Sequence, residues 1–126
     1  MASGWAVMAD WQKLHGYMIL LADPPVASLN NLPPAGRERF LADMGLLRDA
    51  LLAVTDAYRV NYQILGSLEP YLHAHVCPRY LWESDELRRG PTSLYDKTTG
   101  PFFDLDQDRE LMDRIRTWLA AQCPNS

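Results

Sequence analysis

Apolar and polar positions alternate, or run together, in four short segments of the chain, and this pattern predicts four strands. Residues 5–9 and 17–21 are rich in strand-forming side chains and flank a polar stretch that contains Gly16, so they predict an antiparallel pair. Residues 60–65 and 71–78 are separated by a connection too short for a crossover. They predict a second antiparallel pair.

After the second predicted strand, the spacing of apolar residues changes to that of a helix. Pro33 and Pro34 lie where a first helical turn tolerates proline, because an amide there has no intrahelical partner. Apolar residues then recur at alternating steps of four and three, which lays one stripe along a helix. Its members are Phe40, Met44, Leu47, Leu51, Val54 and Tyr58. The pattern predicts an amphipathic helix that lies on the sheet.

The last third of the chain is less regular. Between Arg79 and Asp106 the residues are mostly polar and include Gly90 and Pro91, which indicates an excursion with about one helical turn. From about Gln107 helical spacing returns, with an apolar face of Leu111, Ile115, Trp118 and Leu119. No repeat or linker interrupts the chain, so residues 1–126 are expected to form a single domain.

Composition narrows the class of protein. Hydrophobic residues make up 48% and charged residues 22%, which is typical of globular proteins. The net charge of -4 includes no basic block, so binding to long nucleic acid is not expected, although a small anionic ligand remains open. The longest strongly apolar run, residues 16–22, is too short to cross a membrane. No secretion signal is evident, so a cytoplasmic protein with two reduced thiols, Cys77 and Cys123, is expected.

Two of the three histidines lie in the last predicted strand, within the sequence YLHAHVCP at residues 71–78. An extended strand sends successive side chains to opposite faces. One face therefore carries apolar residues, and the other carries Tyr71, His73, His75 and Cys77.

Three interpretations suit this histidine face. His73, His75 and Cys77 could chelate a metal from one strand. Alternatively, a neutral imidazole could attack a phosphoryl centre while the second histidine holds the phosphate. In the third and simplest interpretation, both histidines lie on a solvated sheet face and have no role.

The surrounding sequence favours the second interpretation. Residues 61–80, NYQILGSLEPYLHAHVCPRY, resemble the histidine triad (HIT) family, whose signature is His-φ-His-φ-His-φ-φ with φ apolar. The likeness includes Leu-Gly before the loop and Pro-Arg-Tyr after the motif, and it extends upstream to Trp5. In this chain the three triad positions are Tyr71, His73 and His75, so the first histidine is replaced by tyrosine.

The resemblance implies an α+β fold, with an antiparallel sheet of about five strands, one long helix and a C-terminal helix, and it implies a homodimer. It implies that His73 takes a nucleotidyl group from the α-phosphate and that His75 contacts the phosphates. Asn61 would face the ribose or phosphate, and Ser67 would approach the phosphates from the turn. Tyr71 would supply a hydrogen bond in place of the first histidine.

The implied activity is hydrolysis or transfer of a nucleotidyl group, on a dinucleoside polyphosphate or a nucleoside phosphoramidate. No cofactor is required and no metal is needed for the covalent step, although Mg²⁺ could arrive with a polyphosphate. The alternative is a nucleotide-binding or regulatory module that lost efficient chemistry with its first histidine. A metalloprotein that uses His73, His75 and Cys77 is the third hypothesis.

Overall fold

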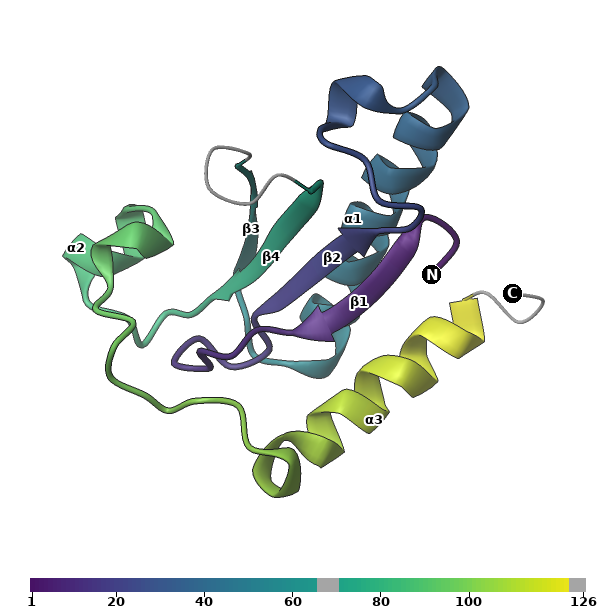
Figure 1. Ribbon diagram of the computed structural model, residues 1–126. Coiled ribbons are helices and arrows are strands. Elements are labelled where there is room, and N and C mark those ends of the chain that lie inside the picture. The colour runs from purple at the N-terminus through teal and green to yellow at the C-terminus, as the bar shows by residue number, and fades with distance from the viewer. Residues whose placement is uncertain (66–70, 123–126) are drawn as a thin grey trace.

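Four strands form one antiparallel sheet, in the order β1-β2-β4-β3 (Figure 1). The computed structural model describes residues 1–65 and 71–122. Its elements in chain order are β1 (Gly4–Met8), β2 (Met18–Ala22), α1 (Pro34–Val54), β3 (Arg59–Ile64), β4 (His73–Arg79), α2 (Asp85–Arg89) and α3 (Leu105–Gln122), with short 3-10 turns at Leu29–Asn31 and Thr92–Leu94. The α+β class and the two main helices agree with the sequence analysis.

The strand count differs from the five strands that the family resemblance implied, because the described residues contain four. The chain leaves the sheet at Arg79, where it turns into α2 instead of returning as a further strand. Among residues 1–65 and 71–122, pairing outside the four strands is limited to one bridge between Trp11 and Phe102.

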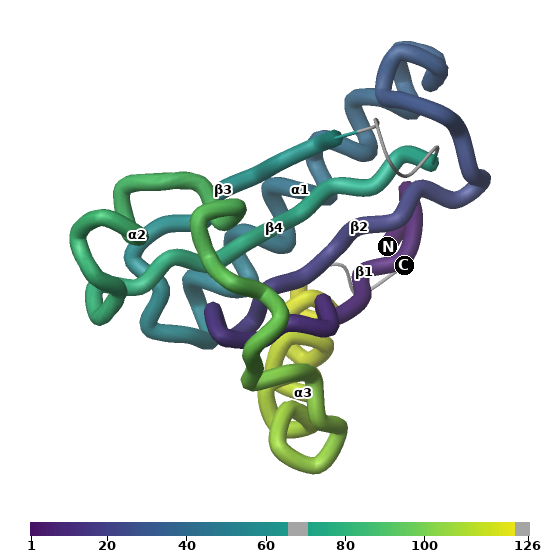
Figure 2. The backbone as a smooth tube through the Cα atoms, turned by 60° about the vertical axis from the view of Figure 1, so that its left-hand side comes forward, coloured from purple at the N-terminus to yellow at the C-terminus, as the bar shows by residue number. Residues whose placement is uncertain are grey.

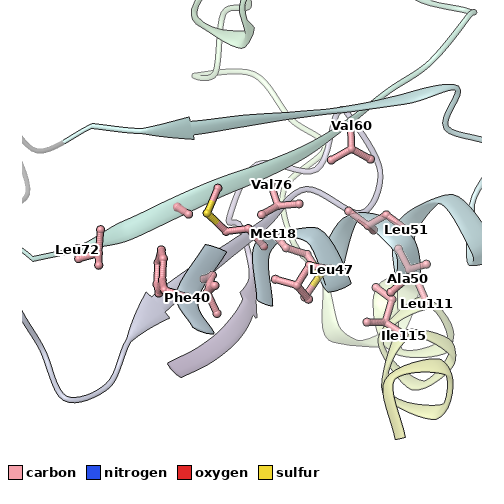
Figure 3. Packing of buried hydrophobic residues seen from close by; sticks show 13 residues of the cluster. Met18, Phe40, Leu47, Ala50, Leu51, Val60, Leu72, Val76, Leu111 and Ile115 are labelled. Carbon is pink, nitrogen blue, oxygen red and sulfur yellow. The ribbon is translucent and has the colours of Figure 1, made fainter. Parts of the chain in front are cut away.

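The helices α1 and α3 build the main core on one face of the sheet. Phe40, Leu47 and Leu51 of α1 are fully buried, and they pack against the apolar side chains of β2 and β4 (Figure 3). Leu111 and Ile115 of α3 complete the cluster. Removing a large side chain from such a core costs about 2–5 kcal/mol, so this face chiefly stabilises the domain.

The long helix ends earlier than its apolar stripe predicts. The stripe continues to Tyr58, but α1 stops at Val54, and the Thr55 hydroxyl donates to the carbonyl of Leu51 at 2.6 Å. The amide of Tyr58 donates to the carbonyl of Arg79 at 3.0 Å, and its side chain is exposed. The prediction that Tyr58 belongs to the helix is therefore wrong, because this residue lies just before β3 and its amide bonds to β4.

A second, smaller cluster covers one end of the opposite face of the sheet. It consists of Ala9, Trp11, Leu14, Tyr17, Cys77 and Tyr80. Figure 2 shows the chain between α2 and α3 running along this end of the sheet. The other end of the same face has exposed apolar side chains on β1 and β2, including Trp5 and Leu21, and within residues 1–65 and 71–122 it is open. No helix among the described residues is long and apolar enough to cross a membrane.

Candidate active site

The strand β4 places His73 and His75 side by side on the open part of this face. Their ring centroids are 5.1 Å apart, the rings are inclined at 70°, and both side chains are half-buried. The alternate residues Leu72, Ala74 and Val76 are buried in the main core. The predicted division of this strand into an apolar face and a histidine face is therefore confirmed.

A main-chain carbonyl determines which ring nitrogen of His73 carries the proton. Its Nδ1 lies 2.8 Å from the carbonyl oxygen of Tyr71. A carbonyl can only accept a hydrogen bond, so Nδ1 carries the proton. In the neutral ring the lone pair is then on Nε2, the nitrogen that this contact leaves free. The geometry provides a ring nitrogen that can act as a nucleophile.

The ring of His75 is held by a buried tyrosine. The hydroxyl of Tyr17 lies 2.7 Å from Nδ1 of His75, and the two rings meet edge to face. Burial raises the pKa of Tyr17 to about 12, so this phenol stays protonated. Burial also lowers the pKa of His75, with smaller contributions from His73 and Lys97. His75 is therefore held as a neutral imidazole near pH 7.

Tyr71, at the first triad position, lies just before β4. Its side chain is 63% exposed, and its hydroxyl makes no hydrogen bond with any residue that the structure describes. The main chain of this residue contributes the carbonyl that orients His73. Among the described residues, Tyr71 therefore contacts His73 through its backbone, and its phenol is available to a ligand.

The other two predicted residues lie farther from the histidines or outside the described residues. Asn61 is on β3, opposite Cys77, so it shares the face of the histidines but lies beyond His75. Its Oδ1 accepts a hydrogen bond of 2.9 Å from Nη1 of Arg79. Ser67 falls within residues 66–70, outside the described residues.

Sequence reasoning missed two residues that flank the histidines. Tyr17 immediately precedes β2, and Gln63 of β3 is the residue opposite His75. Both belong to recognised strand segments, and only the strand register brings them to the site. Knowing that Gln63 faces His75 would have required the pairing of β3 with β4.

The sequence analysis noted Arg79 only as part of Pro-Arg-Tyr and did not predict its buried ion pair. Its guanidinium is buried and forms an ion pair of 2.8 Å with the equally buried Glu83. Burial, the largest single effect, raises the pKa of the Glu83 carboxyl, but the hydrogen bonds that it accepts and the charge of Arg79 together outweigh burial and lower this pKa. Glu83 also accepts from the amide of Tyr80 and the hydroxyl of Tyr95. This pair holds the chain after β4 against the sheet.

Cys77 is poorly suited to bind a metal ion. Its side chain is buried in the second cluster, and burial raises its pKa to about 12, whereas a metal ligand must be a thiolate. Among the described residues, no group of three His, Cys, Asp or Glu side chains is placed to hold a metal ion. His15, the third histidine, is in a loop, 3.7 Å from Asp108.

The fold has counterparts among solved structures. The chain superposes with a TM-score of 0.79 on a histidine triad protein from Sinorhizobium meliloti, with 18% identity over 93% of this chain and 84% of that chain. A histidine triad protein from Bradyrhizobium japonicum gives a TM-score of 0.76, with 16% identity over 94% of this chain and 86% of that chain. One from Marinobacter aquaeolei gives 0.69, with 20% identity over 83% of this chain and 74% of that chain.

No protein-family model and no curated protein matches the sequence. The three structural neighbours therefore show the fold, and the chain has the fold of histidine triad proteins. This agrees with the expectation drawn from residues 61–80.

Proposed function

We propose that the protein is a nucleotidyl hydrolase or transferase of the histidine triad type, which cleaves at the α-phosphate of a small nucleotide through a nucleotidyl-histidine at His73. One observation carries the proposal: the bond from Nδ1 of His73 to the Tyr71 carbonyl leaves the lone pair on Nε2, in a half-exposed ring. An imidazole in this state is a suitable nucleophile toward phosphorus.

In the proposed reaction, Nε2 of His73 attacks the α-phosphorus and forms a P–N bond. The bond from phosphorus to the leaving group breaks, and the leaving group departs with the electron pair and takes up a proton. The positive charge on the phosphorylated ring is stabilised by the Tyr71 carbonyl, which accepts from Nδ1. Water then attacks phosphorus, the P–N bond breaks, and a nucleoside monophosphate is released; a different acceptor would give transfer.

His75 is proposed to hold the phosphate during both steps. In this proposal the Tyr17 hydroxyl donates to Nδ1, so that neutral His75 carries its proton on Nε2. This N–H can donate to a non-bridging oxygen as charge develops there. Tyr17 is therefore a positioning residue, because it acts on the substrate through His75.

Three further residues complete the proposed site. The exposed Tyr71 hydroxyl would hydrogen-bond the leaving group or the phosphates. Asn61 would donate to a phosphate or ribose through its Nδ2, since its Oδ1 is bonded to Arg79. Ser67 would approach the phosphates from the turn before β4.

The proposed substrates are dinucleoside polyphosphates and nucleoside phosphoramidates. The covalent step requires no cofactor, and Mg²⁺ would enter with a polyphosphate. Exposed apolar side chains, among them Trp5 and Trp82, support the further proposal that two copies form a homodimer.

A nucleotide-binding or regulatory module is the alternative. The observation that favours it is the first triad position, where an exposed phenol replaces an imidazole. Such a protein would keep the pocket and bind a nucleoside monophosphate, but it would turn over neither substrate class.

Intact-mass measurement after rapid mixing with an adenosine phosphoramidate, and separately with a diadenosine polyphosphate, tests the proposal. A transient adenylyl adduct is expected in the wild-type protein and not in His73→Ala. His15→Ala is the matched control, since it removes a histidine whose ring lies beside Asp108 of α3. Full activity in His73→Ala would end the assignment, and bound nucleotide without adduct or product would favour the binding module.

A further inference from the structure

A second polar site lies at the other end of β3, where the chain enters this strand beside α2. A cleft of about 460 Å³ is bounded there by residues of β3, of α2 and of the turn after β4. Its lining residues are Tyr58, Arg59, Asn61, Leu81, Arg88, Arg89 and Gly90. Neither His73 nor His75 lines it. Three of the 12 basic side chains of an acidic protein therefore meet in one cleft.

The buried Arg79 donates hydrogen bonds to two acceptor groups of the residues that line this cleft. Its Nη1 donates to Oδ1 of Asn61 at 2.9 Å and to the carbonyl of Gly90 at 2.7 Å. A guanidinium has no acceptor, so Asn61 must turn its oxygen toward Arg79 and its amide NH₂ away from it. That NH₂ makes no hydrogen bond with any residue among 1–65 and 71–122. The cleft is thus left with donors.

The positive charge of the cleft is only partly compensated. Arg88 forms an ion pair of 2.7 Å with Asp85. Arg59 and Arg89 form no ion pair within the described part of the chain. The guanidinium of Arg59 lies 5.8 Å from the centroid of the Tyr58 ring, which orients it by a cation–π contact. Two guanidinium charges and an amide donor therefore remain for a ligand.

We propose that this cleft is an anion site that binds a phosphate group, either as a phosphomonoester or as part of a polyphosphate. Guanidinium groups match the oxygens of phosphate with paired, charge-assisted hydrogen bonds, and two free charges match a phosphate dianion. The exposed side chains of Tyr58 and Leu81 form an apolar wall against which an organic substituent of the phosphate can lie.

The cleft lies apart from the proposed nucleophile, although Asn61 belongs to both proposed sites. Asn61 pairs with Cys77, four residues along β4 from His73, which is about 13 Å at the rise of an extended strand. A phosphate in the cleft is therefore not the phosphate that His73 would attack. It is either a free phosphate compound or a distal phosphate of the molecule that reacts at His73.

Calorimetric titration with pyrophosphate tests the site without reference to catalysis. The wild-type protein is expected to bind it, with affinity that falls as the salt concentration rises. Arg59→Gln and Arg89→Gln should each weaken binding about tenfold, the usual effect of one charge-assisted hydrogen bond. Arg39→Gln is the matched control, because it removes one exposed arginine from α1, away from the cleft.

Equal binding by Arg59→Gln, Arg89→Gln and wild type would overturn the proposal, and so would an equal loss in Arg39→Gln. Binding that disappears in His73→Ala but persists in both cleft variants would place pyrophosphate at the histidines and would also overturn it. Arg59 and Arg89 are exposed, so their variants should fold, and melting curves verify this.

A kinetic comparison separates the two sources of the phosphate, and this arm alone rests on the proposed function. If the substrate carries the phosphate, Arg89→Gln should raise KM for a diadenosine tetraphosphate and leave KM for an adenosine phosphoramidate unchanged. If a free phosphate compound occupies the cleft, KM should be unchanged for both substrates while pyrophosphate binding is still lost. Either result supports an anion site in the cleft.

Discussion

The hydroxyl of Tyr17 lies 2.7 Å from Nδ1 of His75, across 58 positions of sequence. It joins the start of β2 to the centre of β4. With His73 bonded through Nδ1 to the Tyr71 carbonyl, both histidines have their Nδ1 occupied by the protein. Nε2 of both rings is therefore left for a ligand, which is the arrangement that a phosphate with two contacts requires.

Tyr17→Phe tests the role of this contact. The variant keeps the buried ring but removes the hydroxyl that orients His75. We expect kcat/KM for an adenosine phosphoramidate to fall about tenfold, the upper range for one neutral hydrogen bond. Tyr62→Phe is the control. Tyr62 is exposed and pairs with Val76, so it lies on the face of the sheet opposite the histidines. Equal activity of Tyr17→Phe and wild type would show that His75 needs no such restraint.

Tyr71→Phe separates the side chain of the first triad position from its backbone. The carbonyl that orients His73 remains in this variant, so the adenylyl adduct should still form. Loss of the hydroxyl should slow its formation only several-fold, the effect of one neutral hydrogen bond. Rapid-quench mass measurement gives the rate. A loss as complete as that of His73→Ala would contradict the backbone role.

The depressed pKa of His75 predicts a pH dependence of stability. Because burial lowers its pKa in the folded state from the ordinary value of 6.5, the unfolded chain binds more protons at mildly acidic pH. The free energy of unfolding should therefore decrease as the pH falls below about 6.5. Urea titrations at about pH 7 and about pH 5 measure this decrease. His75→Gln should make it smaller, whereas an unchanged decrease would assign it to other groups.

Cys77 is predicted to be chemically inert in the folded protein. A pKa of about 12 reduces the thiolate fraction at neutral pH by about three orders of magnitude relative to an ordinary thiol. In a Cys123→Ser background, iodoacetamide should label Cys77 only after unfolding in urea. Rapid labelling of the native protein would mean that Cys77 is accessible, and it would reopen the metal-chelation hypothesis.

Glu83→Gln should destabilise the domain strongly. The substitution leaves the buried guanidinium of Arg79 without its charged partner, and breaking a buried pair in this way costs about 3 kcal/mol. Asp85→Asn is the matched control, because it breaks an exposed pair with Arg88 and should cost less than about 1 kcal/mol. Chemical denaturation measures both, and similar values for the two variants would show that the Arg79–Glu83 pair adds little.

Local periodicity was sufficient for the elements of this fold, but not for their ends. Proline at the start of a turn located the first residue of α1, because that constraint is local. Tyr58 fits the apolar stripe of α1 equally well, but its amide bonds to Arg79 in β4, a residue 21 positions away. The ends of such strands and helices depend on hydrogen bonds between distant segments, and the local pattern of one sequence does not specify these.

The same distinction applies to the candidate site. Alternation along β4 was enough to place His73 and His75 together, since both are on one strand. Tyr17 and Gln63 reach them only through the registers of β2 and β3 with β4. The cleft around Arg59 is formed by β3 and α2, which are separated in the chain by β4. In the sequence alone, Arg88 and Arg89 have the pattern of ordinary surface charges.

The hydrogen bond between His73 and the Tyr71 carbonyl also bears on how such a protein can change. Because the accepting group belongs to the main chain, replacing the side chain at position 71 does not delete it. His73 is expected to keep its proton on Nδ1 whether position 71 carries an imidazole, a phenol or a smaller group. Under the proposed function, position 71 is thus a place where preference for the leaving group can evolve in single steps, without an intermediate that has lost the capacity to form the covalent bond.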